Sequence, residues 1–235
     1  MNKQSWREKI WRELRDRRRV QGDPSGKIPN FLAAAEAAVH LSHHPAWKAA
    51  KVVKVNPDKA QAPVRAKAIQ AGKTLVMPAP RLAKSKKCFY LIEPGEARRP
   101  AENEATHQWI RRAGNAVHPA NVPHVDLAVV GSVAVNRFGQ RLGKGGGYAD
   151  LELAIGFQAG FINVDTLVAT TVDEIQVVDD HLPQQRHDMI VDIIATQKGR
   201  LDASSLTKSL TPLLREMLDD DQLEAMPVLK DFLDS

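Results

Sequence analysis

The 235-residue chain has one cysteine, Cys88, and few aromatic residues. A lone cysteine can form no internal disulfide, so we expect a reducing, cytoplasmic setting. No apolar run reaches the length of about 18 residues that a membrane span needs. The first twenty residues are charged and lack an apolar core, so no signal peptide is expected. Cys88 stands beside Phe89 in an apolar segment, which favours a core position over a nucleophile.

Charge is unevenly spread, although the net value is only +5. The first twenty residues carry eight Lys or Arg and three acids, whereas the last twenty carry seven acids and one Lys. The basic N-terminal region indicates an anionic ligand such as a nucleotide phosphate or nucleic acid. A solvated helix face explains the same excess of basic residues equally well. The arginine run has little aromatic interleaving, so RNA binding is the weaker interpretation.

The hydrophobic pattern predicts an α/β fold. Apolar, β-branched segments indicate strands at 51–55, 73–80, 87–94, 125–135, 166–172, 175–178 and 189–196. Amphipathic or alanine-rich segments indicate helices at 3–22, 31–41, 63–72, 102–114, 151–160 and 204–218. Alternation of the two predicts a single domain with a largely parallel sheet, at residues 1–203, and an acidic helical appendage at 204–235.

A glycine-rich loop lies between the apolar run 125–135 and the helix 151–160. Its sequence, GQRLGKGGGYAD, spans residues 139–150 and includes Arg141 and Lys144. Backbone N–H groups in such a loop can converge on phosphate oxygens, and Asp150 follows closely enough to hold a magnesium ion against them. The pattern is neither a Walker A loop nor a Rossmann fingerprint. The alternative is a turn without a ligand.

The same stretch resembles the signature of the 5-formyltetrahydrofolate cyclo-ligase family, Gly-x-Arg-Leu-Gly-x-Gly-x-Gly-Tyr-Tyr-Asp. KQSWR, GKTLVMP and LPQQRHDMIVDIIAT are similar to further family elements, and the resemblance covers about residues 3–196. It implies a three-layer α/β sandwich that uses ATP and Mg²⁺. It also implies conversion of 5-formyltetrahydrofolate to 5,10-methenyltetrahydrofolate, so the expected partners are ATP and a reduced folate.

The resemblance assigns roles to individual residues. ATP and its phosphates would be bound by Lys3, Arg7, Arg141, Gly143, Lys144, Gly145, Gly146, Gly147 and Tyr148. Arg141, Lys144 and Tyr148 would also be catalytic, Asp58 and Tyr148 would bind folate, and Asp150 and Asp192 would hold Mg²⁺. Lys3 and Arg7 lie one helical turn apart, so both can face the same phosphates.

Departures from the signature place the chain in a divergent subgroup. Ala149 replaces the second tyrosine, Leu151 replaces a basic residue and Gln61 replaces a threonine. The segments IPNFLAAAEAA and GSVAVNRFGQRLGKGGGYADLE resemble cyclo-ligase-like proteins, also called methenyltetrahydrofolate synthetase domain-containing proteins. Because the changes fall on the folate side, two hypotheses stay open: an active cyclo-ligase, or a nucleotide- or folate-binding protein without turnover. The sequence specifies no oligomeric state.

Histidines occur in two groups that could carry chemistry. His187 and Asp188 could form an acid–base pair, but adjacent residues of a strand point to opposite faces, so only one is expected to face the site. His40, His43 and His44 have no acid or cysteine at ligand spacing, which disfavours a metal centre there.

Overall fold

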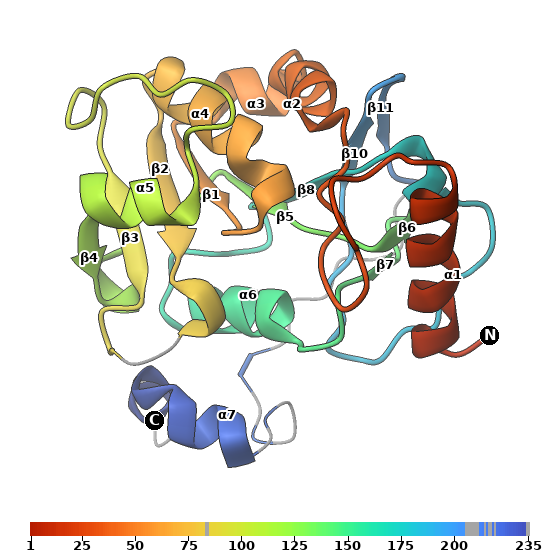
Figure 1. Ribbon diagram of the computed structural model, residues 1–235. Coiled ribbons are helices and arrows are strands. Elements are labelled where there is room, and N and C mark those ends of the chain that lie inside the picture. The colour runs from red at the N-terminus through yellow and green to blue at the C-terminus, as the bar shows by residue number, and fades with distance from the viewer. Residues whose placement is uncertain (83–84, 205–211, 214, 216–217, 219, 234–235) are drawn as a thin grey trace.

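The computed structural model describes residues 1–82, 85–204, 212–213, 215, 218 and 220–233 (Figure 1). An eight-stranded sheet runs in the order β11 (Gly199–Asp202), β10 (Ile193–Thr196), β8 (Leu167–Thr171), β5 (Leu127–Val130), β1 (Val52–Val55), β2 (Thr74–Pro78), β3 (Phe89–Ile92), β4 (Asn115–Val117). The five strands from β10 to β2 are parallel, and β11, β3 and β4 join antiparallel.

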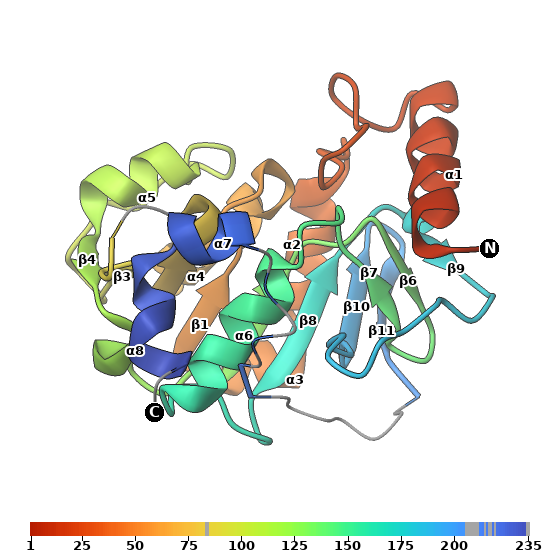
Figure 2. The same cartoon turned by 90° about the horizontal axis from the view of Figure 1, so that it is seen from below.

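Helices cover both faces of this sheet, and α1 packs elsewhere, on a smaller sheet. The helices of the described residues are α1 (Lys3–Asp16), α2 (Ala34–Ser42), α3 (Pro45–Ala49), α4 (Ala62–Gln70), α5 (His107–Ala113), α6 (Tyr148–Gln158), α7 (Asp220–Ala225) and α8 (Lys230–Leu233). Figures 1 and 2 show α2, α3 and α4 on one face and α6, α7 and α8 on the other. This arrangement confirms the α/β class and the largely parallel sheet.

Successive side chains of each strand point to opposite faces of the sheet, so a hydrophobic core forms on each face. In β5, Leu127 and Val129 belong to the cluster under α2 and α4, whereas Ala128 and Val130 belong to the cluster under α6. All four are fully buried, as expected for a strand covered on both faces. In β1 the same alternation turns Lys54 toward α6, between Val53 and Val55, which face the opposite cluster.

A second, three-stranded sheet carries the N-terminal helix. It consists of β7 (Arg141–Leu142), β6 (Ala134–Asn136) and β9 (Val177–Val178). The predicted apolar stripe of α1, Trp6, Ile10 and Leu14, packs with Ala134 and Leu142 of this sheet. Asn2 caps the helix by accepting a hydrogen bond of 2.8 Å from the Ser5 N–H. Helix α1 is thereby fixed beside the chain that leaves β7.

The single strand expected at 125–135 is wrong, because it divides into β5 and β6, which belong to different sheets. The chain leaves the large sheet at Gly131 and Ser132, and the Gln176 side chain donates to the Ser132 carbonyl oxygen over 2.8 Å. The glycine loop therefore follows β7 and not the central strand. The helix expected at 102–114 begins only at His107, because Thr106 caps it through the Trp109 N–H.

The C-terminal segment packs on the sheet face that α6 covers. Most of the helix expected at 204–218 lies outside the described residues, and α7 and α8 follow it. Met226, Val228, Leu229 and Phe232 belong to the same hydrophobic cluster as Ile155 of α6. Among the described residues, no helix is both long enough and apolar enough to cross a membrane.

Candidate functional site

A cleft of about 1280 Å³ opens where the chain leaves β1 and β5. Asn56 and Asp58, which follow β1, line it together with Gly131, which follows β5. From β1 the chain continues through α4 to β2, and from β5 it continues through α6 to β8, on the other side. Adjacent strands whose connections diverge form a topological switch point, where open α/β sheets bind their ligands.

The cleft collects almost all the residues that the sequence singled out. Its lining includes Lys3, Arg7, Asp58, Arg141, Gly143, Lys144, Gly145, Gly146, Gly147, Tyr148 and Asp150. Asp192 does not line it; its carboxylate accepts a hydrogen bond of 2.7 Å from the Val168 N–H and so links β10 to β8.

The glycine loop, residues 143–147, connects β7 to the first turn of α6. Gly145 and Gly147 have φ of +114° and +64°, a region that side chains with a Cβ rarely adopt. Gly147 is the N-cap residue of α6, and no side chain caps the helix there. The N–H groups of the first turn and the positive end of the helix dipole therefore lie at the cleft, an arrangement that favours an anion.

Arg7 joins helix α1 to this loop. Its Nε donates to the Gly143 carbonyl oxygen over 2.8 Å, and a Cβ added to Gly145 would lie 3.6 Å from its guanidinium carbon. Burial lowers the pKa of Arg7, nearby Arg141 lowers it further, and Asp188 opposes the shift. No carboxylate of the described residues forms an ion pair with Arg7, so its charge remains for a ligand.

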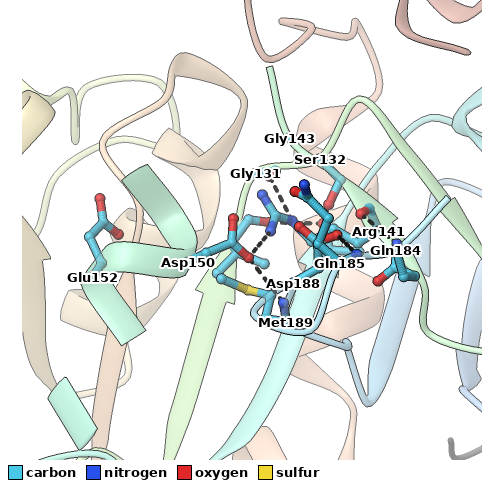
Figure 3. Close-up of polar contacts among 12 residues, drawn as sticks. Gly131, Ser132, Arg141, Gly143, Asp150, Glu152, Gln184, Gln185, Asp188 and Met189 are labelled. Carbon is cyan, nitrogen blue, oxygen red and sulfur yellow. Dashed lines mark hydrogen bonds and ion pairs between the residues drawn. The ribbon is translucent and has the colours of Figure 1, made fainter. Parts of the chain in front are cut away.

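Arg141 is buried at the base of the loop (Figure 3). Its Nε donates to the Gly131 carbonyl oxygen over 3.3 Å, and its Nη1 lies 3.4 Å from the Asp150 carboxylate. Asp150 also accepts a hydrogen bond of 3.0 Å from the Met189 N–H. The guanidinium is thus held at the switch point by contacts from two sides.

Two further lysines reach the cleft with acidic partners. Lys3 Nζ lies 2.5 Å from Asp188, which also accepts from the Gln185 N–H. Lys144 Nζ lies 3.5 Å from Asp58, and its side chain is largely solvent-exposed. The Lys144–Asp58 contact is long and its lysine is exposed, so an incoming anion can exchange for the carboxylate there, whereas the Lys3–Asp188 pair is close and partly buried.

The 186–188 segment corrects the expectation for His187 and Asp188. It is a turn rather than a strand, so the alternation rule does not apply and both residues line the cleft. The Asp188 carboxylate forms an ion pair with Lys3. The turn is closed locally, because the Asp188 N–H donates to the Gln185 carbonyl oxygen over 3.1 Å and the Gln185 N–H donates to the Asp188 carboxylate. The sequence pattern alone could not reveal the contact of Asp188 with Lys3, which is 185 residues away in the chain.

A buried ion pair forms the floor of the cleft on the α6 side. Lys54 Nζ contacts the Glu152 carboxylate and donates to Asn56 Oδ1 over 2.7 Å. Lys54 and Glu152 are 0% and 2% exposed. Burial raises the pKa of Glu152, and the Lys54 ammonium opposes this shift. Glu152 and Asn56 both line the cleft, so a ligand meets a polar floor.

Sequence reasoning missed this network. A lysine inside the apolar segment KVVKV was the available signal, because a lysine that alternates with buried valines must face either solvent or a buried acid. It also missed Gln222, a cleft residue from α7.

The carboxylates of the cleft could bind Mg²⁺ only if phosphate oxygens supplied further ligands to the ion. No three His, Cys, Asp or Glu side chains gather into a metal cluster within the part of the chain that the structure describes. Asp150 stands in the first turn of α6, beside the loop. Mg²⁺ commonly takes one or two carboxylates and completes its shell with phosphate oxygens and water, which this site can accommodate.

Comparison with known proteins identifies the family of the chain. The model of the 5-formyltetrahydrofolate cyclo-ligase family matches residues 2–197. The methenyltetrahydrofolate synthase domain-containing proteins of Mus musculus and Bos taurus are 37% and 34% identical, each over 98% of this chain. These matches cover 63% and 61% of the relatives, so the chain spans about three fifths of their length.

Solved structures are similar in fold. The 5,10-methenyltetrahydrofolate synthetase of Aquifex aeolicus superposes with a TM-score of 0.55 at 22% identity, covering 92% of this chain and 99% of the other. The synthetase of Mycoplasma pneumoniae gives a TM-score of 0.51 at 15% identity, covering 84% and 99%. With the family model matching nearly the whole α/β unit, this chain belongs to the 5-formyltetrahydrofolate cyclo-ligase family.

Proposed function

We propose that the chain is an ATP- and Mg²⁺-dependent cyclo-ligase that converts 5-formyltetrahydrofolate, or a related N-formyl compound, to its cyclised product. In this reaction the formyl oxygen attacks the γ-phosphorus of ATP and ADP leaves. The neighbouring amine nitrogen then attacks the formyl carbon, and phosphate departs with the oxygen. The amine also gives up its proton, which leaves a methenyl bridge between the two nitrogens.

The observation that carries this proposal is the half-buried Arg7 guanidinium against the glycine loop, which forms no ion pair among the described residues. Partial burial disfavours the charged form of the guanidinium, and a bound anion would offset that cost. Phosphoryl transfer depends mainly on positioning and charge neutralisation, so a fixed cradle of cations and N–H groups is the equipment it requires. We assign the triphosphate to Arg7, Arg141 and the loop 143–147, with Lys3 and Lys144 at its edges.

The remaining assignments follow from the positions around this cradle. Asp150 is the proposed Mg²⁺ ligand, because it stands in the first turn of α6, directly after the loop; the ion would neutralise phosphate charge. Tyr148 and Asp58 also line the cleft and are the proposed folate contacts. Lys144 would exchange its contact with Asp58 for the transferred phosphoryl group, which would free the Asp58 carboxylate for the substrate.

Ala149 favours the second candidate, a nucleotide- or folate-binding protein without turnover. It lines the cleft at the position where the family signature has a tyrosine, so the cleft lacks an aromatic wall there. Binding of phosphate needs no such wall, whereas alignment of the formyl oxygen with the γ-phosphorus depends on one.

A turnover assay separates the two candidates. The protein is mixed with 5-formyltetrahydrofolate and Mg-ATP, and methenyl absorbance and ADP are followed together in a single turnover. Stoichiometric formation of both products supports the cyclo-ligase. Binding of ATP without either product supports the non-catalytic candidate, and the absence of binding to either compound contradicts both.

A further inference from the structure

The C-terminal segment contributes a wall to the cleft. Its described residues are 212–213, 215, 218 and 220–233, all beyond the residues 2–197 that the family model matches. Leu218 and Gln222 of this segment line the cleft with the glycine loop. Figures 1 and 2 both place α7 and α8 beside α6, which that loop precedes. Nothing in the family match assigns the segment a role at the site.

Several contacts anchor the segment to the α/β unit. Gln158 of α6 donates to the Phe232 carbonyl oxygen over 2.5 Å. The Asp231 carboxylate lies 2.5 Å from Lys86 Nζ and 3.1 Å from His118 Nε2. The ring of His118 also stacks on Phe232, with centroids 6.1 Å apart. Together with the apolar residues under α6, these contacts fix where α7 stands.

Gln222 connects this anchored segment to the loop. The side chain is only 7% exposed, and its Nε2 donates to the Gly146 carbonyl oxygen over 3.1 Å. The Gly146 carbonyl and the Gly147 N–H belong to one planar trans peptide, so they point in opposite directions. A hydrogen bond that draws the carbonyl toward Gln222 therefore turns the Gly147 N–H away from the C-terminal segment.

The loop needs such a constraint. This peptide joins Gly146 to Gly147, so its orientation is set by the ψ of Gly146 and by the φ of Gly147, which is +64°. Glycine reaches positive and negative φ with similar ease, so a peptide between two glycines has alternative orientations of comparable energy. In most of them the N–H groups would not converge on one point. An anion site made of backbone donors binds well only when their directions are fixed beforehand.

We infer that Gln222 is a positioning residue of the phosphate site: it fixes the Gly146–Gly147 peptide so that the loop is organised before the ligand arrives. The C-terminal segment is then part of the site rather than an appendage to the domain. This inference rests on the proposed phosphate role of the loop.

Gln222→Met tests it, because methionine keeps the length of the side chain and removes the donor without adding charge. Glu224→Met is the matched control, since Glu224 is exposed on the same helix and does not line the cleft. Gln222→Ala removes the same donor and serves as the second variant. Two readouts are taken with the full chain: hydrogen exchange of the peptide that contains 143–148, and affinity for inorganic tripolyphosphate and Mg-ATP.

The expected result is faster exchange of the loop and about three- to tenfold weaker phosphate binding in both Gln222 variants, with the thermal midpoint close to wild type. Glu224→Met should match wild type in both. Wild-type exchange and affinity in the Gln222 variants would overturn the inference, as would equal changes in the control. If the wild-type protein binds neither phosphate compound, the proposed function fails, whereas the exchange comparison still decides whether Gln222 holds the loop.

Discussion

The Arg7 Nε donates a hydrogen bond to the Gly143 carbonyl oxygen over 2.8 Å, and this contact joins the N-terminal helix to the glycine loop 136 residues later in the chain. The Nη1 of Arg7 donates to Gln4 Oε1 over 3.4 Å on the same helix, and Arg7 lines the cleft. In the proposed function Arg7 both supports the loop and supplies a charge for the ligand, which makes it the first residue to test.

Arg7→Ala is expected to lower the affinity for Mg-ATP by about tenfold or more. Loss of one charge-assisted hydrogen bond costs about 1.5–3 kcal/mol, and 1.4 kcal/mol corresponds to a factor of ten. Calorimetric titration measures the change. Arg12→Ala is the control, because Arg12 is exposed on the same helix and does not line the cleft. Equal affinities in the two variants would show that the helix contributes only general positive charge.

Gly147→Val is expected to abolish nucleotide binding. Gly147 has a φ of +64°, which a β-branched residue resists, and the new side chain would stand among the N–H donors of the first turn of α6. Gly160→Val is the matched control, since Gly160 has a φ of +83° at the other end of the helix and equally open surroundings. Both variants should lose similar stability in urea. ATP binding that survives in Gly147→Val would mean that the loop is a turn without a ligand.

Ala149→Tyr is expected to raise single-turnover formation of methenyltetrahydrofolate by about tenfold or more. Misplacement of reacting groups by about 1 Å can cost on the order of a hundredfold in rate, and a tyrosine would supply the missing wall of the cleft. Val164→Tyr adds the same side chain at an exposed loop position and should leave the rate unchanged. If the wild-type rate already equals that of Ala149→Tyr, the aromatic wall is not what limits turnover.

Glu152→Gln is expected to destabilise the protein by about 3–5 kcal/mol. The substitution leaves the buried Lys54 ammonium without its counter-ion, which is far costlier than loss of a surface pair. Urea unfolding measures the effect. The double variant Lys54→Met/Glu152→Leu should recover most of the loss, because it removes both charges. Glu104→Gln, at the exposed Arg98–Glu104 pair, should change stability little. A small effect of Glu152→Gln would show that the pair is not ionised together.

Cys88 is expected to resist alkylation by iodoacetamide at pH 8. Burial raises the pKa of the thiol to about 12, so the reactive thiolate is a minor species until the pH approaches that value. Mass spectrometry of the alkylated protein follows the reaction, with the urea-unfolded chain as the reference for an accessible thiol. Rapid alkylation of the native protein would indicate that the core around Phe89 opens on the time scale of the assay.

Much of the fold could be predicted from local sequence patterns. KVVKV and TLVMP form β1 and β2, and the stripe Trp6, Ile10, Leu14 packs on the small sheet. The hydrophobic pattern did not predict the strands correctly where contacts with residues distant in the sequence determine the structure. Strand β5 ends before Gly131 and Ser132, because the Gln176 side chain donates a hydrogen bond to the Ser132 carbonyl oxygen. β11 is an edge strand defined only by its pairing with β10.

The same contrast between local patterns and long-range contacts applies to the candidate site. The loop 143–147 and its basic residues could be recognised from the sequence because close approach to an anion requires a local run of glycines. Glu152 and Gln222 could not, because their roles depend on Lys54 and Gly146, which are distant in the chain. The family resemblance assigns Asp192 to the Mg²⁺ site. In the structure its carboxylate accepts a hydrogen bond from the Val168 N–H, and the residue does not line the cleft.

The most direct test of the central claim is an amide-resolved NMR titration with Mg-ATP. If the glycine loop holds the phosphates, the amide signals of Gly143, Gly145, Gly146, Gly147 and Tyr148 shift together and saturate with one affinity. The signals of Gly72 and Gly160, which lie outside the cleft, should stay in place. Saturable shifts elsewhere, with the loop signals unmoved, would contradict the account and place the nucleotide at another site.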